Sequence, residues 1–164
     1  MNILDTLPVV STVRRNHGIE HATIHILTAQ FRPAALVGHA TLDGFNLYGE
    51  VATEQVEWAA GEALRRLRSG DSHLVIHPNC GTNFATAGMA AGIAAWIAGM
   101  GGGKMSGKLP RIMVASTLAL MLAMPLGFSV QEHITTSPHV GGAQVLGVAR
   151  EKRGGLTRHQ VRIG

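Results

Sequence analysis

The chain has 164 residues, of which 46% are hydrophobic and only 15% charged, and its mean hydropathy is +0.18. The charge is unevenly distributed, because residues 72–103 and 112–131 contain no Asp, Glu, Lys or Arg. Outside these two segments, the share of charged residues is that of an ordinary soluble domain. The pattern excludes a disordered chain and, with one cysteine, a disulfide scaffold.

The basic balance of the chain does not indicate a nucleic-acid partner. The net charge of +4 and the isoelectric point near 10 come from Arg and Lys residues scattered in twos and threes. Aromatic residues make up only 4%, so no stacking platform accompanies a basic groove. We therefore expect no nucleic-acid binding, and instead a charged surface near the lipid bilayer. The N-terminus lacks a basic segment followed by an apolar one, so no cleavable signal peptide is expected.

The N-terminal third predicts a long helix followed by a β-hairpin. Ser11 or Thr12 can cap the helix, which extends to about residue 30. Two extended segments follow at residues 35–41 and 45–48. An Asp-Gly pair between them is typical of a tight hairpin turn.

A second helix is expected over residues 53–68, with its apolar residues on one face and Gly70 after its end. Residues 73–77 form a short apolar run between two histidines and predict a short strand. The loop HPNCGTN comes next and leads into the first uncharged segment.

The two uncharged segments predict a transmembrane helical hairpin. Residues 84–101 and 112–130 each approach the ~20 residues that cross a bilayer core. Gly88 and Gly92 form a small-xxx-small pair, which allows close helix approach in lipid. Pro125 is expected to kink or end the second helix.

After the hairpin, residues 143–149 and 157–163 predict a second pair of strands. The sequence therefore indicates an α+β fold, a small soluble α/β domain interrupted by a two-helix transmembrane hairpin. We expect an N-terminal α+β domain over residues 1–83, the hairpin over 84–130, and a β-hairpin over 131–164 that packs on the N-terminal domain. A hairpin leaves both soluble segments on one side of the membrane, and the cytoplasmic side of the inner membrane is the simpler expectation.

The motif His17-Gly18-Ile19-Glu20-His21 carries the chemistry, and His25 extends it. Residues four apart on a helix lie about 40° apart around its axis, so the three histidines share one face. Imidazoles in an apolar interior are costly unless they find partners. A zinc ion meets that need, because neutral imidazole is a natural zinc ligand. Glu20 would then act as general base toward water.

The order H-x-x-E-H resembles the motif of the inverted zinc peptidases, the inverzincins. The resemblance implies that His17 and His21 ligate zinc and that Glu20 is the catalytic base. Inverzincins take a third ligand, a glutamate, from a distant helix. The candidates here fall on the polar or flanking sides of their predicted helix, which favours a solvated face: Glu54, Glu57 and Glu62. His25, His77 and Cys80 are better placed alternatives for the third ligand.

A broader resemblance covers most of the chain. The segments HGIEHATIHIL, GFNLYGEV, EALRRLRSG, HLVIHPNCGTN and ITTSPHVG, with the apolar hairpin, together are similar to an uncharacterised bacterial membrane-protein family. The resemblance implies the domain and hairpin organisation without naming a reaction.

Two functions follow from these patterns. The first is a membrane-anchored zinc protein with metallopeptidase-like hydrolytic chemistry, which acts on membrane or membrane-proximal proteins. The second is a non-enzymatic metal-binding or assembly subunit of a membrane complex, in which the histidines fill the coordination sphere. A third interpretation is purely structural, with the histidines satisfied by hydrogen bonds.

Overall fold

The computed structural model describes residues 3–164, except for the side chain of Arg153, and divides into two units. Unit 1 comprises the residues up to 77 together with 132–164, and unit 2 comprises residues 78–131. The main helices are α1 (Pro8–Phe31) and α2 (Thr53–Arg68) in unit 1, and α3 (Gly81–Gly99) and α4 (Met105–Val130) in unit 2. Short helical turns are η1 (Ile3–Thr6), η2 (Ser72–Val75) and the π-helical η3 (Gln131–Thr135).

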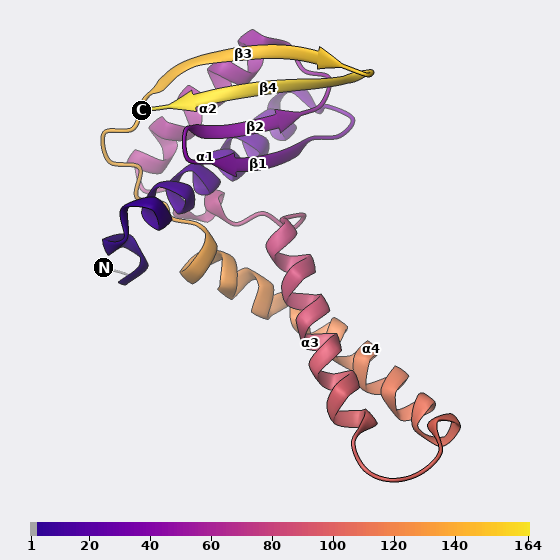
Figure 1. The fold of residues 1–164 in the computed structure, drawn as a ribbon. Helices are drawn as coiled ribbons and strands as arrows, with labels where there is room; N and C mark the ends of the chain where they lie inside the picture. Colours follow the sequence, from indigo (N-terminus) through magenta and orange to yellow (C-terminus); the bar gives the residue numbers. More distant parts are fainter. Residues whose placement is uncertain (1–2) are drawn as a thin grey trace. The chain divides into compact units, whose positions relative to one another are not determined.

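Unit 1 contains a four-stranded antiparallel sheet, drawn in Figure 1. Its strands are β1 (Val37–Thr41), β2 (Gly44–Tyr48), β3 (Val145–Arg153) and β4 (Leu156–Ile163), in the order β1-β2-β4-β3. The C-terminal hairpin therefore joins the N-terminal one through the pairing of β2 with β4. Helices combined with an antiparallel sheet confirm the α+β class.

The core of unit 1 lies where α1 and α2 contact the sheet. Every second residue of β4 is buried, as the two-residue period of a strand requires when one face is covered. Phe45 and Leu47 of β2 and Val161 of β4 meet Ile19 and Leu27 of α1 in this core.

Helix α1 begins one turn earlier than the sequence predicted. Pro8 occupies its first turn and Leu7 its N-cap, with no side-chain cap, so the prediction of Ser11 or Thr12 as the cap is wrong. Proline favours this position because its fixed φ fits a helix and its missing N–H would have no partner there. From Arg14 to Leu27 the helix is buried almost all round.

The predicted strand at residues 73–77 is also wrong, since Ser72–Val75 forms the 3-10 turn η2. Leu74 and Val75 are buried, but no strand within residues 3–164 takes up their backbone groups. The carbonyl groups of Val75 and Ile76 instead accept hydrogen bonds from histidines of α1. The side-chain pattern of five residues does not distinguish a short strand from a 3-10 turn.

Unit 2 is a helical hairpin whose close contacts differ from those expected. A Cβ added at Gly88 or Gly92 would meet no described atom within 4 Å, so these two glycines do not form the helix contact. Gly127 does, because a Cβ there would lie 2.5 Å from Oδ1 of Asn83. Pro125 lies inside α4 and does not end it, since the helix continues to Val130 and into the π-helical η3.

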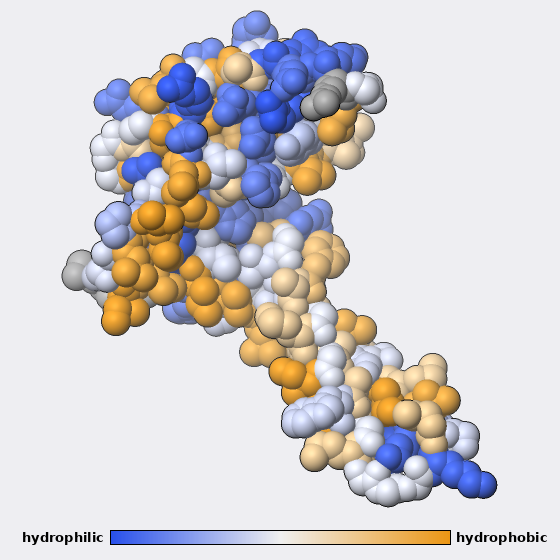
Figure 2. Space-filling model, in the orientation of Figure 1, coloured by the Kyte–Doolittle hydropathy of each residue, from blue (hydrophilic) through white to orange (hydrophobic). Residues whose placement is uncertain are grey.

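Within residues 3–164, one helix is long and apolar enough to span a membrane. It covers Met105–Thr135, and its most apolar window of 18 residues has a mean hydropathy of 1.9 and is only 11% buried. Helix α3, richer in Ala and Gly, does not meet the same criterion, so the structure supports the second of the two predicted transmembrane helices and not the first. Figure 2 shows apolar residues along much of the surface of this helical hairpin.

The buried histidine of β4, His159, predicts a pH dependence of stability. Its side chain is 0% exposed, and burial, followed by the charge of Arg150, lowers the pKa of its imidazole below 6.5. As pH falls below 6.5, the unfolded chain binds a proton that the folded chain does not, so stability decreases until the folded-state pKa is reached. We expect the His159→Gln variant to lose less stability between pH 7.5 and 5 than the wild type. Denaturant unfolding at both pH values tests this, and equal losses in the two proteins would contradict it.

Candidate metal centre

Four histidines of unit 1 lie side by side. His17, His21 and His25 come from successive turns of α1, and His77 follows η2. The ring centroids of His17 and His21 are 4.4 Å apart, and those of His25 and His77 are 4.7 Å apart. His21 and His77 connect the two pairs at 5.7 Å. The four predicted metal-ligating histidines therefore form one cluster, which we call the histidine cluster.

Backbone carbonyl groups orient three of these rings. Nδ1 of His17 lies 2.9 Å from the Thr135 carbonyl oxygen, and Nδ1 of His21 lies 2.6 Å from that of Val75. A carbonyl oxygen only accepts, so each of these nitrogens carries the proton and donates. In both neutral rings, Nε2 then has the lone pair that a metal ion requires. Metal-binding histidines commonly donate their second N–H to such a partner, which fixes tautomer and orientation.

His25 uses the opposite nitrogen. Its Nε2 donates to the Ile76 carbonyl oxygen at 2.8 Å, which leaves the lone pair on Nδ1. One ring nitrogen of His17 and one of His21 lie within 4.8 Å of each other. His17 and His21 therefore have the spacing of a candidate metal site. His25 differs from both, because its lone pair lies on Nδ1 and theirs lie on Nε2.

The fourth member, His77, is held in the neutral form. Burial, followed by the charge of His25, lowers the pKa of its imidazole from 6.5 to about 4. At neutral pH the ring is therefore unprotonated, which is the form that binds zinc.

Glu20 lies in α1, directly before His21 in the chain, and is only 4% exposed. Its carboxyl group lies over Gly38 of β1, where a Cβ would come within 2.0 Å of Oε1 and 2.4 Å of Cδ. Any other residue at position 38 would therefore collide with the carboxyl group. A buried carboxylate is costly, and such groups are concentrated at functional sites.

The glycine of the motif has a packing role. A Cβ at Gly18 would lie 2.5 Å from the carbonyl oxygen of Ser137. The Ser137 N–H donates to the Arg14 carbonyl oxygen at 3.0 Å, so residues 135–137 lie directly along α1. This close approach brings the Thr135 carbonyl group to His17.

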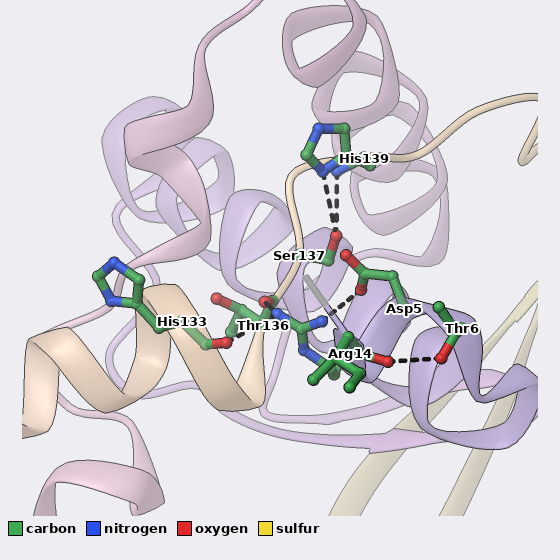
Figure 3. A network of polar contacts seen from close by, with 8 residues as sticks. Asp5, Thr6, Arg14, His133, Thr136, Ser137 and His139 are labelled. Carbon is green, nitrogen blue, oxygen red and sulfur yellow. Dashed lines mark hydrogen bonds and ion pairs between the residues drawn. The ribbon is translucent and has the colours of Figure 1, made fainter. Parts of the chain in front are cut away.

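The side chain of the buried Arg14 also binds this part of the chain, through the backbone of His133 and Thr136, as Figure 3 shows. Its guanidinium group forms an ion pair with Asp5 and donates to the carbonyl groups of His133 and Thr136 at 3.1 and 3.0 Å. Asp5, Arg14 and His133 border a cleft of about 830 Å³ in unit 1. The cleft also brings together three histidines that the sequence alone did not group: His73, His133 and His139.

The alternative third ligands have different positions. Glu62 forms ion pairs with Arg65 and Arg66, and their hydrogen bonds hold the pKa of its carboxyl group at about 2. Glu54 and Glu57 are exposed on α2, in agreement with a solvated face. Cys80 belongs to unit 2, where its thiol accepts a hydrogen bond from the Thr82 N–H at the start of α3. Its role as a ligand stays a prediction.

Residues 12–148 match a family described as a domain of unknown function, DUF6391. The chain belongs to the DUF6391 family. An uncharacterized protein of Picosynechococcus sp. (strain ATCC 27264 / PCC 7002 / PR-6) is 36% identical over 139 residues. The match covers 76% of this chain and 66% of that protein, so the chain spans slightly less than two thirds of its relative. No solved structure gives a significant match. These findings confirm the resemblance to an uncharacterised family.

The DUF6391 match contains the whole histidine cluster, Glu20 and the segment around Thr135. Sequence reasoning identified the histidines and Glu20 but missed Gly38 and Arg14. Gly38 has no local signal, because its role depends on contact with another element. Arg14 had a weak one, since it lies one helical turn before Gly18 on a helix expected to be buried.

Proposed function

We propose that this DUF6391 protein is a membrane-anchored zinc-binding protein with metallopeptidase-like hydrolytic chemistry. The observation that carries the proposal is the set of oriented imidazoles on α1. The same helix carries the buried carboxyl group of Glu20, the residue before His21, which lies over Gly38. A purely structural histidine cluster does not require a buried acid on the same helix.

The donor set fits zinc. His17 and His21 offer neutral imidazole nitrogens, each with its second N–H bound to a carbonyl group. His77 or His25 supplies the third nitrogen, and a catalytic zinc site has three protein ligands with one open position. When bound there, zinc would polarise a carbonyl group and lower the pKa of water.

Glu20 performs the proton transfers in this proposal. Its carboxylate takes a proton from the water molecule whose oxygen forms a bond to the peptide carbonyl carbon. The carbon–nitrogen bond then breaks, and Glu20 returns that proton to the leaving amine. The products are a carboxylic acid and an amine, and Glu20 ends in its initial state.

The membrane part of the proposal rests on the apolar helix Met105–Thr135. We infer that this helix, accompanied by α3, anchors the chain as a hairpin in the inner membrane with unit 1 on the cytoplasmic side. The partners are then the lipid bilayer and membrane or membrane-proximal protein substrates.

A second candidate function is a non-enzymatic metal-binding or assembly subunit of a membrane complex. The adjacency of His25 and His77 favours it, because four imidazoles are enough to fill a tetrahedral zinc site. A closed site leaves no position for water.

Metal content and proteolysis, measured on the same preparations, test both candidates. Wild type, Glu20→Gln and His21→Ala are compared, with His39→Ala on β1 as the control, since His39 lies outside the cluster. We expect zinc in the wild type, Glu20→Gln and the control, and its loss from His21→Ala. Cleavage of a casein-type substrate should be lost in Glu20→Gln alone among the zinc-loaded proteins.

Two other outcomes decide against one or both functions. Zinc without activity in any protein would favour the non-enzymatic subunit. The absence of stoichiometric metal from the wild type would refute both. Single substitutions His25→Ala, His77→Ala and Cys80→Ala identify the further ligand as the one whose loss weakens zinc binding.

A further inference from the structure

Unit 1 exposes large apolar side chains around its N-terminus. Ile3, Leu7 and Val9 are 80%, 53% and 63% exposed, and Ile134 is 52% exposed. We call these four residues the N-terminal apolar patch, and Figure 2 shows orange surface gathered in this part of unit 1. Exposed apolar patches on a folded unit are typical of interaction surfaces.

Arg14 joins the two segments that contribute to the patch. Its guanidinium group binds Asp5 of η1 on one side and the carbonyl groups of His133 and Thr136 on the other (Figure 3). The turn that carries Ile3 is therefore held beside the segment that carries Ile134, within unit 1.

The second segment is continuous with the apolar helix. Met105–Thr135 is the helix long and apolar enough to span a membrane, and Ile134 lies at its C-terminal end. In a helix that crosses the bilayer, this end lies at the boundary of headgroups and acyl chains. Because Arg14 holds η1 beside residues 133–136, a bilayer crossed by this helix would meet Ile3 and Leu7 near the same boundary.

We propose that unit 1 rests on the lipid bilayer through the N-terminal apolar patch. The inference depends on the proposed membrane anchor and adds a second contact to it. The patch side chains are uncharged and the Asp5 carboxylate is paired with Arg14, so the contact is insertion into the boundary region and does not require anionic lipid. The cleft lined by Asp5, Arg14 and His133 then has its rim at the membrane surface.

Environment-sensitive fluorescence of the full chain tests the contact. Leu7→Cys and Leu156→Cys, each in a Cys80→Ala background, are labelled with nitrobenzoxadiazole and reconstituted into phosphatidylcholine vesicles. Leu156 at the start of β4 is the matched control, because it is 54% exposed and Leu7 is 53% exposed. We expect a blue-shifted, several-fold brighter emission from position 7 that spin-labelled lipid quenches, and a water-like emission from position 156.

Flotation of the vesicles separates the failure of this inference from that of the anchor. If the protein floats with the vesicles while position 7 emits as position 156 does, the patch contact is refuted and the anchor stands. If the protein does not float, the anchor and the patch contact are both refuted. Equal blue shifts at both positions would refute a contact made specifically through the patch.

Discussion

Replacement of Arg14 by alanine is expected to lower the free energy of unfolding of unit 1 by about 3 kcal/mol. Its guanidinium group donates two hydrogen bonds to backbone carbonyl groups, each contributing about 1.5 kcal/mol when the donor is charged. The ion pair with Asp5 adds less, because Asp5 is 24% exposed. Denaturant unfolding in detergent, followed by the fluorescence of Trp58 in a Trp96→Phe background, measures the loss.

Arg65→Ala is the matched control for this measurement. Arg65 forms an ion pair with Glu62, but its side chain is 67% exposed, so we expect a much smaller effect. Arg14→Lys should fall between alanine and wild type, since lysine keeps the charge and loses the planar fork. Equal stability of Arg14→Ala and Arg65→Ala would contradict the role of Arg14 as the residue that joins η1, α1 and residues 133–136.

Replacement of Gly38 by alanine is expected to displace the Glu20 carboxyl group. The added Cβ would lie 2.0 Å from Oε1 and 2.7 Å from Cγ, so the buried side chain must move. Overpacking of this kind costs about 1–3 kcal/mol of stability. If Glu20 is the general base, a displacement of about 1 Å lowers hydrolysis by about 100-fold. Zinc content should stay unchanged, because no cluster histidine is altered.

A double-mutant cycle isolates the contact. In a Glu20→Ala background the carboxyl group is gone, so Gly38→Ala should cost much less stability than in the wild type. Gly61→Ala on α2 is the control, since a Cβ there meets no described atom within 4 Å and alanine favours the helix. An equal cost of Gly38→Ala in both backgrounds would show that position 38 does not act through Glu20.

The patterns that sequence reasoning read correctly are those with a strong local period or turn. The helix at Thr53–Arg68 has the bounds that its apolar face predicted. The predicted N-terminal β-hairpin also forms, but its turn residues are Leu42 and Asp43, one position earlier than predicted, because Gly44 is the first residue of β2 and pairs with Thr41. The stripe of His17, His21 and His25 follows from helical geometry alone. The strand predicted at residues 73–77 does not form, because a short apolar segment becomes a strand only when a neighbouring strand binds it.

The membrane prediction also has one part that local sequence supports and one part that depends on tertiary contacts. Residues 112–130 are apolar enough for their helix to meet the length and hydropathy criterion without tertiary information. Residues 84–101 are rich in Ala and Gly, and composition did not reveal which glycines make close contacts. A Cβ added at Gly127 would meet Asn83, whereas one added at Gly88 or Gly92 would meet no described atom within 4 Å. The rotation of each helix about its axis decides which of its faces contacts the other helix.

By itself, the sequence determined the α+β class, the long helix with its histidine stripe, and membership of an uncharacterised family. Only the tertiary structure added His77 to that stripe, set the ring tautomers through the carbonyl groups of Thr135, Val75 and Ile76, and seated Glu20 over Gly38. The physical reason is the range of the interactions. Helical period and turn chemistry act over a few residues, whereas each of these contacts joins residues that are distant in the chain.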